Sequence, residues 1–271
     1  MTAAATSTSR IADTFARLKK QRKTALMPYH AAGFPTLELS RRIIVSLVEA
    51  GADMVEIGIP FSDPIADGPS VQGASQIALD QGTRLKDCIE LVRHLRADGM
   101  TAPLLLMGYY NPILKYGVAR YVADCADAGV DGFIVPDLPT EESDTLRHEC
   151  MVHGRDLIFM VAPTSTESRL ASAARRGNGF MYCVSVTGVT GARENMSATL
   201  SEYIARIRSH TDLPLAIGFG ISKPEHVTQV GEIADGAIVG AALINALNTV
   251  SNAEMPAKAA EFVRYLRGVD S

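Results

Sequence analysis

The sequence predicts an α/β protein folded as one (β/α)8 barrel with an extra N-terminal helix. Three observations favour this fold. Eight short apolar runs alternate with amphipathic segments, the 271 residues suit a single α/β barrel, and no Pro-, Gly- or Ser-rich linker divides the chain. An open, doubly wound sheet is the alternative. The strand count and the lack of an early Gly-x-Gly-x-x-Gly turn argue against it.

Short apolar runs bounded by turn residues are typical of buried strands. They occupy residues 25–30, 53–59, 103–109, 132–136, 156–161, 180–185, 214–219 and 236–240. Helical patterns lie between them, at residues 37–50, 85–98, 117–128, 141–152, 167–176, 200–210 and 224–231. A helix at residues 9–20 precedes the first strand, and one at residues 253–266 closes the chain. We therefore assign residues 9–271 to the barrel and residues 1–8, which are mostly small or hydroxylated, to a disordered leader.

The helix ends carry recognisable signals. Thr164-x-x-Glu167 and Ser222-x-x-Glu225 predict capping boxes. Helices are expected to stop at glycines, namely Gly51, Gly129, Gly177 and Gly231. Three similar linkers, residues 50–53, 128–131 and 233–236, each join the end of a helix to a buried strand through an aspartate.

Composition excludes several classes of protein. The net charge is −4 without a basic patch, so no nucleic-acid partner is expected. No apolar run approaches the roughly 20 residues that span a bilayer, so no membrane partner is expected. Four dispersed cysteines indicate buried free thiols in a reducing cytoplasm: Cys88, Cys125, Cys150 and Cys183. The closest histidines, His148 and His153, lack metal-ligand spacing, so no metal site is expected.

The candidate catalytic segment is residues 54–69, where a strand carries Glu56 and the loop after it carries Asp67. Strand alternation places Glu56 on the face that points into the barrel. Active sites of such barrels lie where strands end and βα loops begin, so both carboxylates belong to that rim. A structural carboxylate held by hydrogen-bond donors is an equally good interpretation of Glu56 alone. Asp63-Pro64 and Asp67-Gly68 are also ordinary turn dipeptides.

Two further loops are functional candidates. Residues 186–197 follow the sixth strand and predict a mobile lid, with a plain flexible connection as the alternative. Gly218-Phe219-Gly220 and Gly240-Ala241-Ala242 end the seventh and eighth strands. Loops at these two places commonly bind phosphate in this fold, although such glycines also serve strand–helix packing.

Glu56-Ile57-Gly58-Ile59-Pro60-Phe61-Ser62-Asp63-Pro64, followed by Ala66-Asp67-Gly68-Pro69, resembles the tryptophan synthase alpha subunit family. Ser185-Val186-Thr187-Gly188-Val189-Thr190-Gly191 and Gly218-Phe219-Gly220-Ile221-Ser222 also resemble it, and the resemblance runs from about residue 25 to 247. It implies a cytoplasmic lyase of tryptophan biosynthesis that cleaves indole-3-glycerol phosphate to indole and glyceraldehyde 3-phosphate. It also implies a beta-subunit partner in an alpha2beta2 heterotetramer, with pyridoxal phosphate only in the partner.

The resemblance also implies residue roles. Glu56 protonates C3 of the indole ring, and Asp67 accepts from the indole N–H. The implied substrate-binding residues are Tyr29, Tyr109, Ile134, Tyr182, Thr190 and Phe219, and the implied phosphate-binding residues are Gly191, Gly220, Gly240 and Ala241. The chain departs from the family pattern at Ala31, Phe34 and Ala241, where Thr, Asp and Ser are usual.

Three other functions are alternatives. These alternatives are a stand-alone indole-glycerol-phosphate lyase, a non-catalytic activating homologue, and another phosphosugar barrel enzyme. The joint presence of Glu56, Asp67 and Tyr182 argues against a non-catalytic homologue. An acidic loop after the second strand argues against a phosphosugar isomerase.

Overall fold

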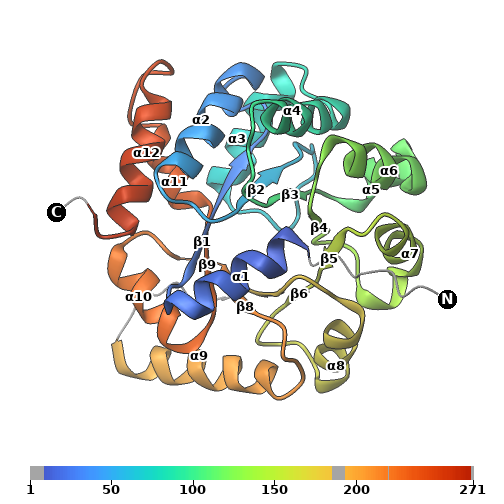
Figure 1. The fold of residues 1–271 in the computed structure, drawn as a ribbon, viewed down its shortest axis with the longest axis vertical. Helices are drawn as coiled ribbons and strands as arrows, with labels where there is room; N and C mark the ends of the chain where they lie inside the picture. The colour runs from blue at the N-terminus through green and yellow to red at the C-terminus, as the bar shows by residue number, and fades with distance from the viewer. Residues whose placement is uncertain (1–8, 185–192, 219, 270–271) are drawn as a thin grey trace.

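The computed structural model describes residues 9–184, 193–218 and 220–269. Within them, parallel strands form one sheet rolled into a nearly closed barrel, and helices surround it (Figure 1). The strands follow the order β5-β4-β3-β2-β1-β9-β8-β7-β6. The predicted α/β barrel is therefore confirmed. The predicted leader, residues 1–8, lies outside the described part of the chain.

The strands are β1 (Ala25–Ala31), β2 (Val55–Gly58), β3 (Leu104–Met107), β4 (Gly132–Ile134), β5 (Asp156–Ile158), β6 (Met160–Val161), β7 (Met181–Val184), β8 (Leu215–Gly218) and β9 (Gly236–Val239). The helices are α1 (Arg10–Gln21), α2 (Leu37–Glu49), α3 (Pro69–Asp80), α4 (Leu85–Ala97), α5 (Tyr110–Tyr116), α6 (Val118–Ala128), α7 (Asp144–Val152), α8 (Glu167–Arg176), α9 (Arg193–Arg208), α10 (Pro224–Ile233), α11 (Ala241–Leu247) and α12 (Met255–Leu266). A short 3-10 turn, η1 (Thr140–Glu142), precedes α7.

The fifth predicted strand, residues 156–161, is divided in the structure. Its first part, β5, pairs with β4, and its second part, β6, pairs with β7. Phe159 lies between the two parts, and its carbonyl accepts the N–H of Tyr182 at 3.1 Å. The prediction of one continuous strand is wrong, because the pairing with β4 ends at Ile158 and the pairing with β7 begins at Met160. The two parts together fill one of eight places in the barrel.

The helix predictions need three corrections. Helix α3 was not predicted, because its buried face consists of the small residues Ala74, Ser75 and Ala78 and gives no apolar period. Helix α9 begins at Arg193, inside the predicted loop 186–197, whose residues 186–192 lie outside the described residues. The predicted helix 117–128 is preceded by a separate short helix, α5.

Both predicted capping boxes are wrong. Helix α8 is capped by Thr166, whose hydroxyl accepts from the N–H of Arg169, and α10 has Lys223 at its N-cap with no side-chain bond. Gly231 lies inside α10, where a Cβ would approach the Thr24 hydroxyl oxygen to 2.2 Å. This glycine is therefore required for close packing against Thr24, and it does not end the helix. The other three predicted glycines do follow helix ends.

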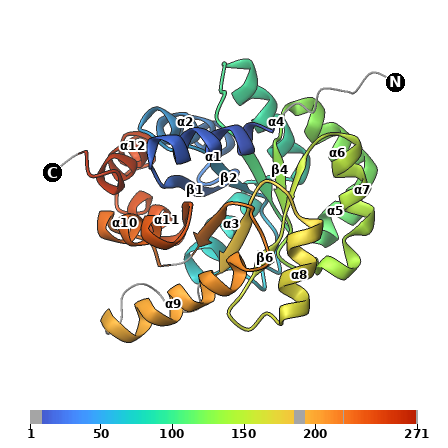
Figure 2. The same ribbon diagram turned by 60° about the horizontal axis from the view of Figure 1, so that its bottom comes forward.

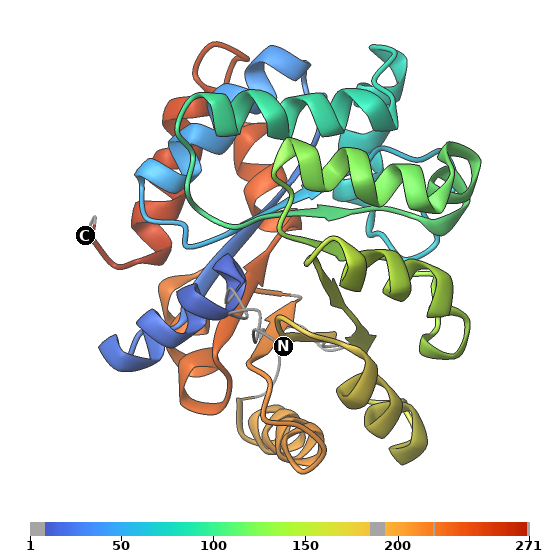
Figure 3. The same ribbon diagram turned by 45° about the vertical axis from the view of Figure 1, so that its right-hand side comes forward.

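The apolar core has two layers. Val55 and Ile57 belong to the outer layer, between the strands and the surrounding helices, whereas Met54 belongs to the inner layer inside the barrel. The predicted N-terminal helix is confirmed as α1, which contributes Ile11, Phe15 and Leu18 to the inner layer. In Figures 1 and 3 this helix lies against the ring of strands. It therefore closes the end of the barrel at which the strands begin.

The aspartates of the three repeated linkers have one shared role. Each carboxylate accepts an N–H from the first or second residue of a neighbouring strand, at 2.8 to 3.0 Å: Asp53 from Leu26, Asp131 from Leu104, and Asp235 from Leu215. An arginine also pairs with each: Arg17 with Asp53, Arg96 with Asp131, and Arg208 with Asp235. A buried strand N–H at the end of the sheet needs such an acceptor, so these carboxylates complete the hydrogen bonding of the strands.

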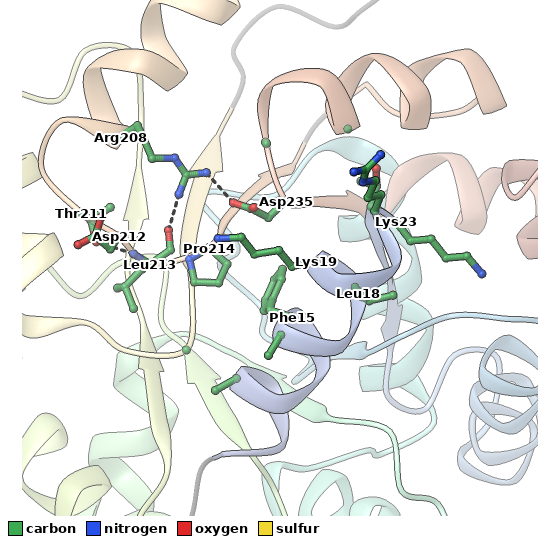
Figure 4. Close-up of a pocket in the computed structure, with 17 residues that line it drawn as sticks. Phe15, Leu18, Lys19, Lys23, Arg208, Thr211, Asp212, Leu213, Pro214 and Asp235 are labelled. Atoms are coloured by element: carbon green, nitrogen blue, oxygen red, sulfur yellow. Dashed lines mark hydrogen bonds and ion pairs between the residues drawn. The ribbon is translucent and has the colours of Figure 1, made fainter.

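A groove of about 680 Å³ lies at the same end, between α1 and the start of β8. Figure 4 shows Lys19 extending along it near the Arg208–Asp235 pair. None of the predicted site residues that the structure describes lines this groove. In Figures 1 and 2, α12 lies beside α2, so the first and last parts of the barrel pack together. No helix in the described part of the chain is long and apolar enough to cross a bilayer.

Candidate active site

Glu56 lies inside the barrel, as predicted. On β2 it is in register with Tyr29 of β1 and Leu105 of β3, and the residue is 3% exposed. Neither of its carboxyl oxygens has a hydrogen-bond partner among the described residues. Burial, followed by the nearby charge of Asp67, raises the pKa of Glu56 to about 8. Glu56 therefore holds a transferable proton at neutral pH.

Asp67 lies on the loop between β2 and α3 and is only partly buried. Burial raises the pKa of Asp67, whereas a hydrogen bond with Tyr109 opposes the rise. The Tyr109 hydroxyl also accepts the N–H of Ala66 at 3.0 Å, and its ring lies 5.2 Å from that of Phe61. Tyr109 thus holds this loop at the mouth of the barrel. Asp67 is less buried than Glu56, so burial penalises its charged form less.

Two more tyrosines project into the barrel beside Glu56, and each lies against a glycine of the next strand. A Cβ at Gly58 would lie 2.0 Å from the Tyr29 hydroxyl oxygen, and a Cβ at Gly218 would lie 2.4 Å from that of Tyr182. Any side chain at either glycine would displace the phenol. Burial first, then the negative charges of Glu56 and Asp67, raises the pKa of Tyr29 and Tyr182 well above the usual range.

These five residues form the group that we call the acid chamber: Glu56, Asp67, Tyr29, Tyr109 and Tyr182. Ile134, at the end of β4, belongs to the inner apolar layer with Tyr182. The chamber thus joins a protonated carboxyl and an ionisable carboxyl to aromatic and apolar walls. This arrangement can deliver a proton to a flat apolar ring while an anion stabilises positive charge on that ring.

The described phosphate candidates lie after β8 and β9. Gly220 is exposed with φ of +75°, Gly240 is the N-cap of α11, and Ala241 is the exposed first residue of that helix. Gly240 lies close to Tyr29, because a Cβ there would be 3.6 Å from Tyr29 Cβ. The backbone N–H of Ser222 is already used, since it donates to Nδ1 of His226 at 3.2 Å. Thr190, Gly191 and Phe219 lie outside the described residues.

One residue of this region was missed from the sequence. Ser75 is buried on α3, and its side chain lowers the pKa of Tyr29 against the larger effect of burial. It lies on the helix that the sequence did not predict, so no pattern connected it to the site. In the described ranges, no group of three or more His, Cys, Asp or Glu side chains is arranged to hold a metal ion. The four cysteines are free and buried, as predicted.

Comparison with known proteins identifies the family to which this chain is similar. Residues 15–268 match the family model described as tryptophan synthase alpha chain. The tryptophan synthase alpha chain of Roseiflexus castenholzii is 52% identical over 260 residues, covering 96% of this chain and all of that protein. The one from Chloroflexus aggregans is 49% identical over 258 residues, covering 95% of this chain and 97% of that protein.

Solved structures give the same result. Tryptophan synthase subunit alpha from Legionella pneumophila superposes with a TM-score of 0.89 at 36% identity, covering 97% of this chain and 98% of that one. A chain of tryptophan synthase from M. tuberculosis, in an aminoacrylate-bound form, superposes with a TM-score of 0.85 at 33% identity. That match covers 96% of this chain and 100% of the other.

Proposed function

The chain belongs to the tryptophan synthase alpha chain family, and from this premise we propose that Glu56 and Asp67 carry out its reaction. The alpha reaction is a carbon–carbon lyase step of tryptophan biosynthesis, the retro-aldol cleavage of indole-3-glycerol phosphate to indole and glyceraldehyde 3-phosphate. One observation carries the residue assignment. Glu56 is a buried carboxyl with no hydrogen-bond partner in the described part of the chain, and its pKa of about 8 keeps it protonated beside a second carboxylate.

The two carboxyls take different roles because their surroundings differ. Glu56 delivers its proton to C3 of the indole ring, which makes the ring an indolenine cation. Asp67, as the anion, accepts from the ring N–H and stabilises that positive charge. A base then removes the proton of the C3′ hydroxyl, the C3–C3′ bond breaks, and its electron pair restores the indole. The aldehyde of glyceraldehyde 3-phosphate forms at C3′.

The remaining residues bind the substrate. Tyr182, Tyr109, Ile134 and Tyr29 enclose the indole ring, together with Phe219 and Thr190. Gly220, Gly240 and Ala241, together with Gly191, bind the phosphate through backbone N–H groups. The support for this assignment is the position of Gly220 and Gly240 at the ends of β8 and β9.

The test is indole release by the Glu56→Gln variant. Glutamine keeps the shape of the side chain but has no acidic proton. General acid catalysis contributes typically 10² to 10⁴-fold, so we expect a loss of at least about 100-fold in kcat. The binding of glycerol phosphate should persist, because phosphate contacts remain. Near-normal indole release by this variant would refute the role of Glu56.

The family has a beta-subunit partner, and we propose that the two assemble as an alpha2beta2 heterotetramer in the cytoplasm. Pyridoxal phosphate then belongs to the partner, and this chain acts without a cofactor. Two exposed apolar side chains suit a docking surface on the catalytic rim: Ile65, 84% exposed on the loop of Asp67, and Leu114, 53% exposed on α5. Light scattering of the mixed subunits measures the stoichiometry, and the appearance of only 1:1 complexes would exclude the heterotetramer.

A further inference from the structure

We propose that Asp137 is a positioning residue for Asp67, because its carboxylate fixes the backbone beside Tyr109, whose phenol holds the loop that carries Asp67. This inference rests on the proposed role of Asp67 in the reaction. It goes further than that role, because it names a residue of a different βα loop that sets the position of the Asp67 carboxylate.

Tyr109 is held between two hydrogen bonds to the neighbouring strand and its loop. Before it, the N–H of Gly108 donates to the carbonyl of Ile134, the last residue of β4, at 3.1 Å. After it, the N–H of Tyr110 donates to Oδ1 of Asp137 at 2.9 Å. Tyr109 is 4% exposed. Its backbone is therefore fixed on both sides while these two bonds are made.

The bond to Asp137 is the one of the two that depends on a side chain. Tyr110 is the first residue of α5, and the opening N–H groups of a helix have no partner within it. Tyr109 is the N-cap of α5, but its own side chain makes no capping bond. Asp137 supplies the acceptor from the loop after β4. Loss of this carboxylate therefore frees the start of α5 without removing the pairing of β3 with β4.

The phenol of Tyr109 carries this fixed position to the loop between β2 and α3. Its hydroxyl accepts the N–H of Ala66 at 3.0 Å, and its ring lies 5.2 Å from that of Phe61. Gln72 also holds this loop, since its side chain donates to the carbonyl of Asp67 at 2.8 Å, but Gln72 belongs to the helix that follows the loop directly. The bond to Tyr109 therefore ties the loop to the neighbouring strand β3.

The reaction makes the position of Asp67 important. The cation that Asp67 stabilises forms only after proton transfer to the ring, so a displaced carboxylate weakens the transition state more than substrate binding. Ser62, Asp63, Ile65 and Ala66 of this loop are exposed. Because exposed loops are drawn from the less stable parts of a structure, a single anchoring hydrogen bond has a large share in fixing their conformation.

The decisive variant is Asp137→Ala, which removes the acceptor of the Tyr110 N–H. Asp137 is exposed, so the fold should tolerate the change. We expect kcat for indole release to fall by roughly 3- to 10-fold, the effect of losing one hydrogen bond, with KM changed by less than about twofold. Asp137→Asn keeps an acceptor oxygen and should restore kcat to within about twofold of the unmodified chain. Equal losses in the two variants would contradict a role as hydrogen-bond acceptor.

Asp87→Ala is the matched control. The Asp87 carboxylate accepts the N–H of Arg84 at 2.8 Å, so this variant also loses a hydrogen bond at the start of a helix, α4. It should leave kcat unchanged. Tyr109→Phe removes the acceptor of the Ala66 N–H, and its combination with Asp137→Ala should equal Tyr109→Phe alone, since Asp137 acts through that hydroxyl. An additive loss in the double variant would overturn the proposed link.

A second readout does not depend on turnover. The amide hydrogen of Ala66 belongs to an exposed residue, and its bond to Tyr109 slows its exchange with solvent. By nuclear magnetic resonance, we expect this exchange to be roughly 3- to 10-fold faster in Asp137→Ala, and unchanged in Asp137→Asn and Asp87→Ala. An unchanged rate in Asp137→Ala would overturn the inference even if Asp67 proves to act in the reaction. If the chain does not cleave indole-3-glycerol phosphate, the proposed function fails, and exchange at Ala66 still tests the link from Asp137 to the loop.

Discussion

At the scale of single residues, the reactive group of this protein is also a weak point of its fold. Glu56 lies among apolar and phenolic side chains, and no residue that the structure describes donates to its oxygens. A carboxyl in such a place is tolerated only while it is neutral. The same burial that prepares an acid for proton transfer therefore makes the native state sensitive to pH.

This predicts that Glu56→Gln stabilises the protein at alkaline pH. The folded-state pKa of about 8 lies above the ordinary value of 4.5, so the native state binds more protons than the unfolded chain between these values. Stability is therefore lost as pH rises from about 4.5 to 8. Glutamine removes this loss. The difference in free energy of unfolding between the variant and the unmodified protein should therefore favour the variant more at pH 9 than at pH 4, by on the order of a few kcal/mol.

Urea unfolding of both proteins from pH 4 to pH 9 measures the difference. Glu232→Gln is the control, because Glu232 is exposed on α10 and its substitution should leave the pH dependence unchanged. A constant difference between Glu56→Gln and the unmodified protein across the pH range would show that Glu56 is not buried as an acid.

At the scale of elements, the aspartates that precede strands explain the repeated linkers. The sequence shows three copies of a pattern, and the structure gives the reason: each carboxylate closes a strand ladder and pairs with an arginine. The most buried example is Asp131, which accepts from Leu104 and pairs with Arg96 and Arg10. Through Arg10 it also fastens α1 to the barrel.

Asp131→Ala should therefore destabilise the fold by about 3–5 kcal/mol, because it leaves the largely buried Arg96 without a counter-charge and the Leu104 N–H without an acceptor. Asp127→Ala is the matched control, since Asp127 pairs with Arg93 at 2.7 Å but its side chain is 75% exposed. The control should cost less than about 1 kcal/mol. Equal losses in chemical denaturation of the two variants would contradict a structural role for Asp131.

The helices and strands also show which parts of the fold can be predicted from the sequence. Strands were predictable because buried parallel strands are apolar along their length, and α1 was predictable from its apolar period. Helix α3 was not, because it buries alanines and a serine instead of large apolar groups. The break in the fifth strand at Phe159 was not predictable either, because it depends on how the two neighbouring strands pair with that run. In the site, Glu56 stood out within a strand, whereas the close approach of the Tyr29 phenol to Gly58 joins two strands that only folding brings together.

At the scale of the whole molecule, the two ends of the barrel differ. One end is closed by α1 and ion pairs. The other end carries the acid chamber and a loop whose Ile65 is almost fully exposed. An isolated apolar side chain beside a reaction site gives a partner subunit a point of contact without entering the chemistry.

We therefore predict that Ile65→Ser weakens the beta subunit's stimulation of the alpha reaction, while the activity of the isolated chain changes little. An apolar anchor in an interface contributes more than about 1 kcal/mol, so the half-saturating partner concentration should rise by roughly fivefold or more. Met151→Ser is the control, because Met151 is 62% exposed near the end of α7, away from the rim. Equal effects of the two substitutions would place the docking surface elsewhere.

The pairing of β1 with β9 has a consequence for synthesis of the chain. Strand β1 emerges early from the ribosome, but β9 follows about 200 residues later, which takes roughly 10 to 40 s at about 5–20 residues per second. During that interval β1 can pair only with β2, and its other margin of N–H and C=O groups has no partner. The nascent protein is therefore open to association with other unfinished chains for much of its synthesis. Barrel closure by one of the last strands marks the moment at which that exposure ends.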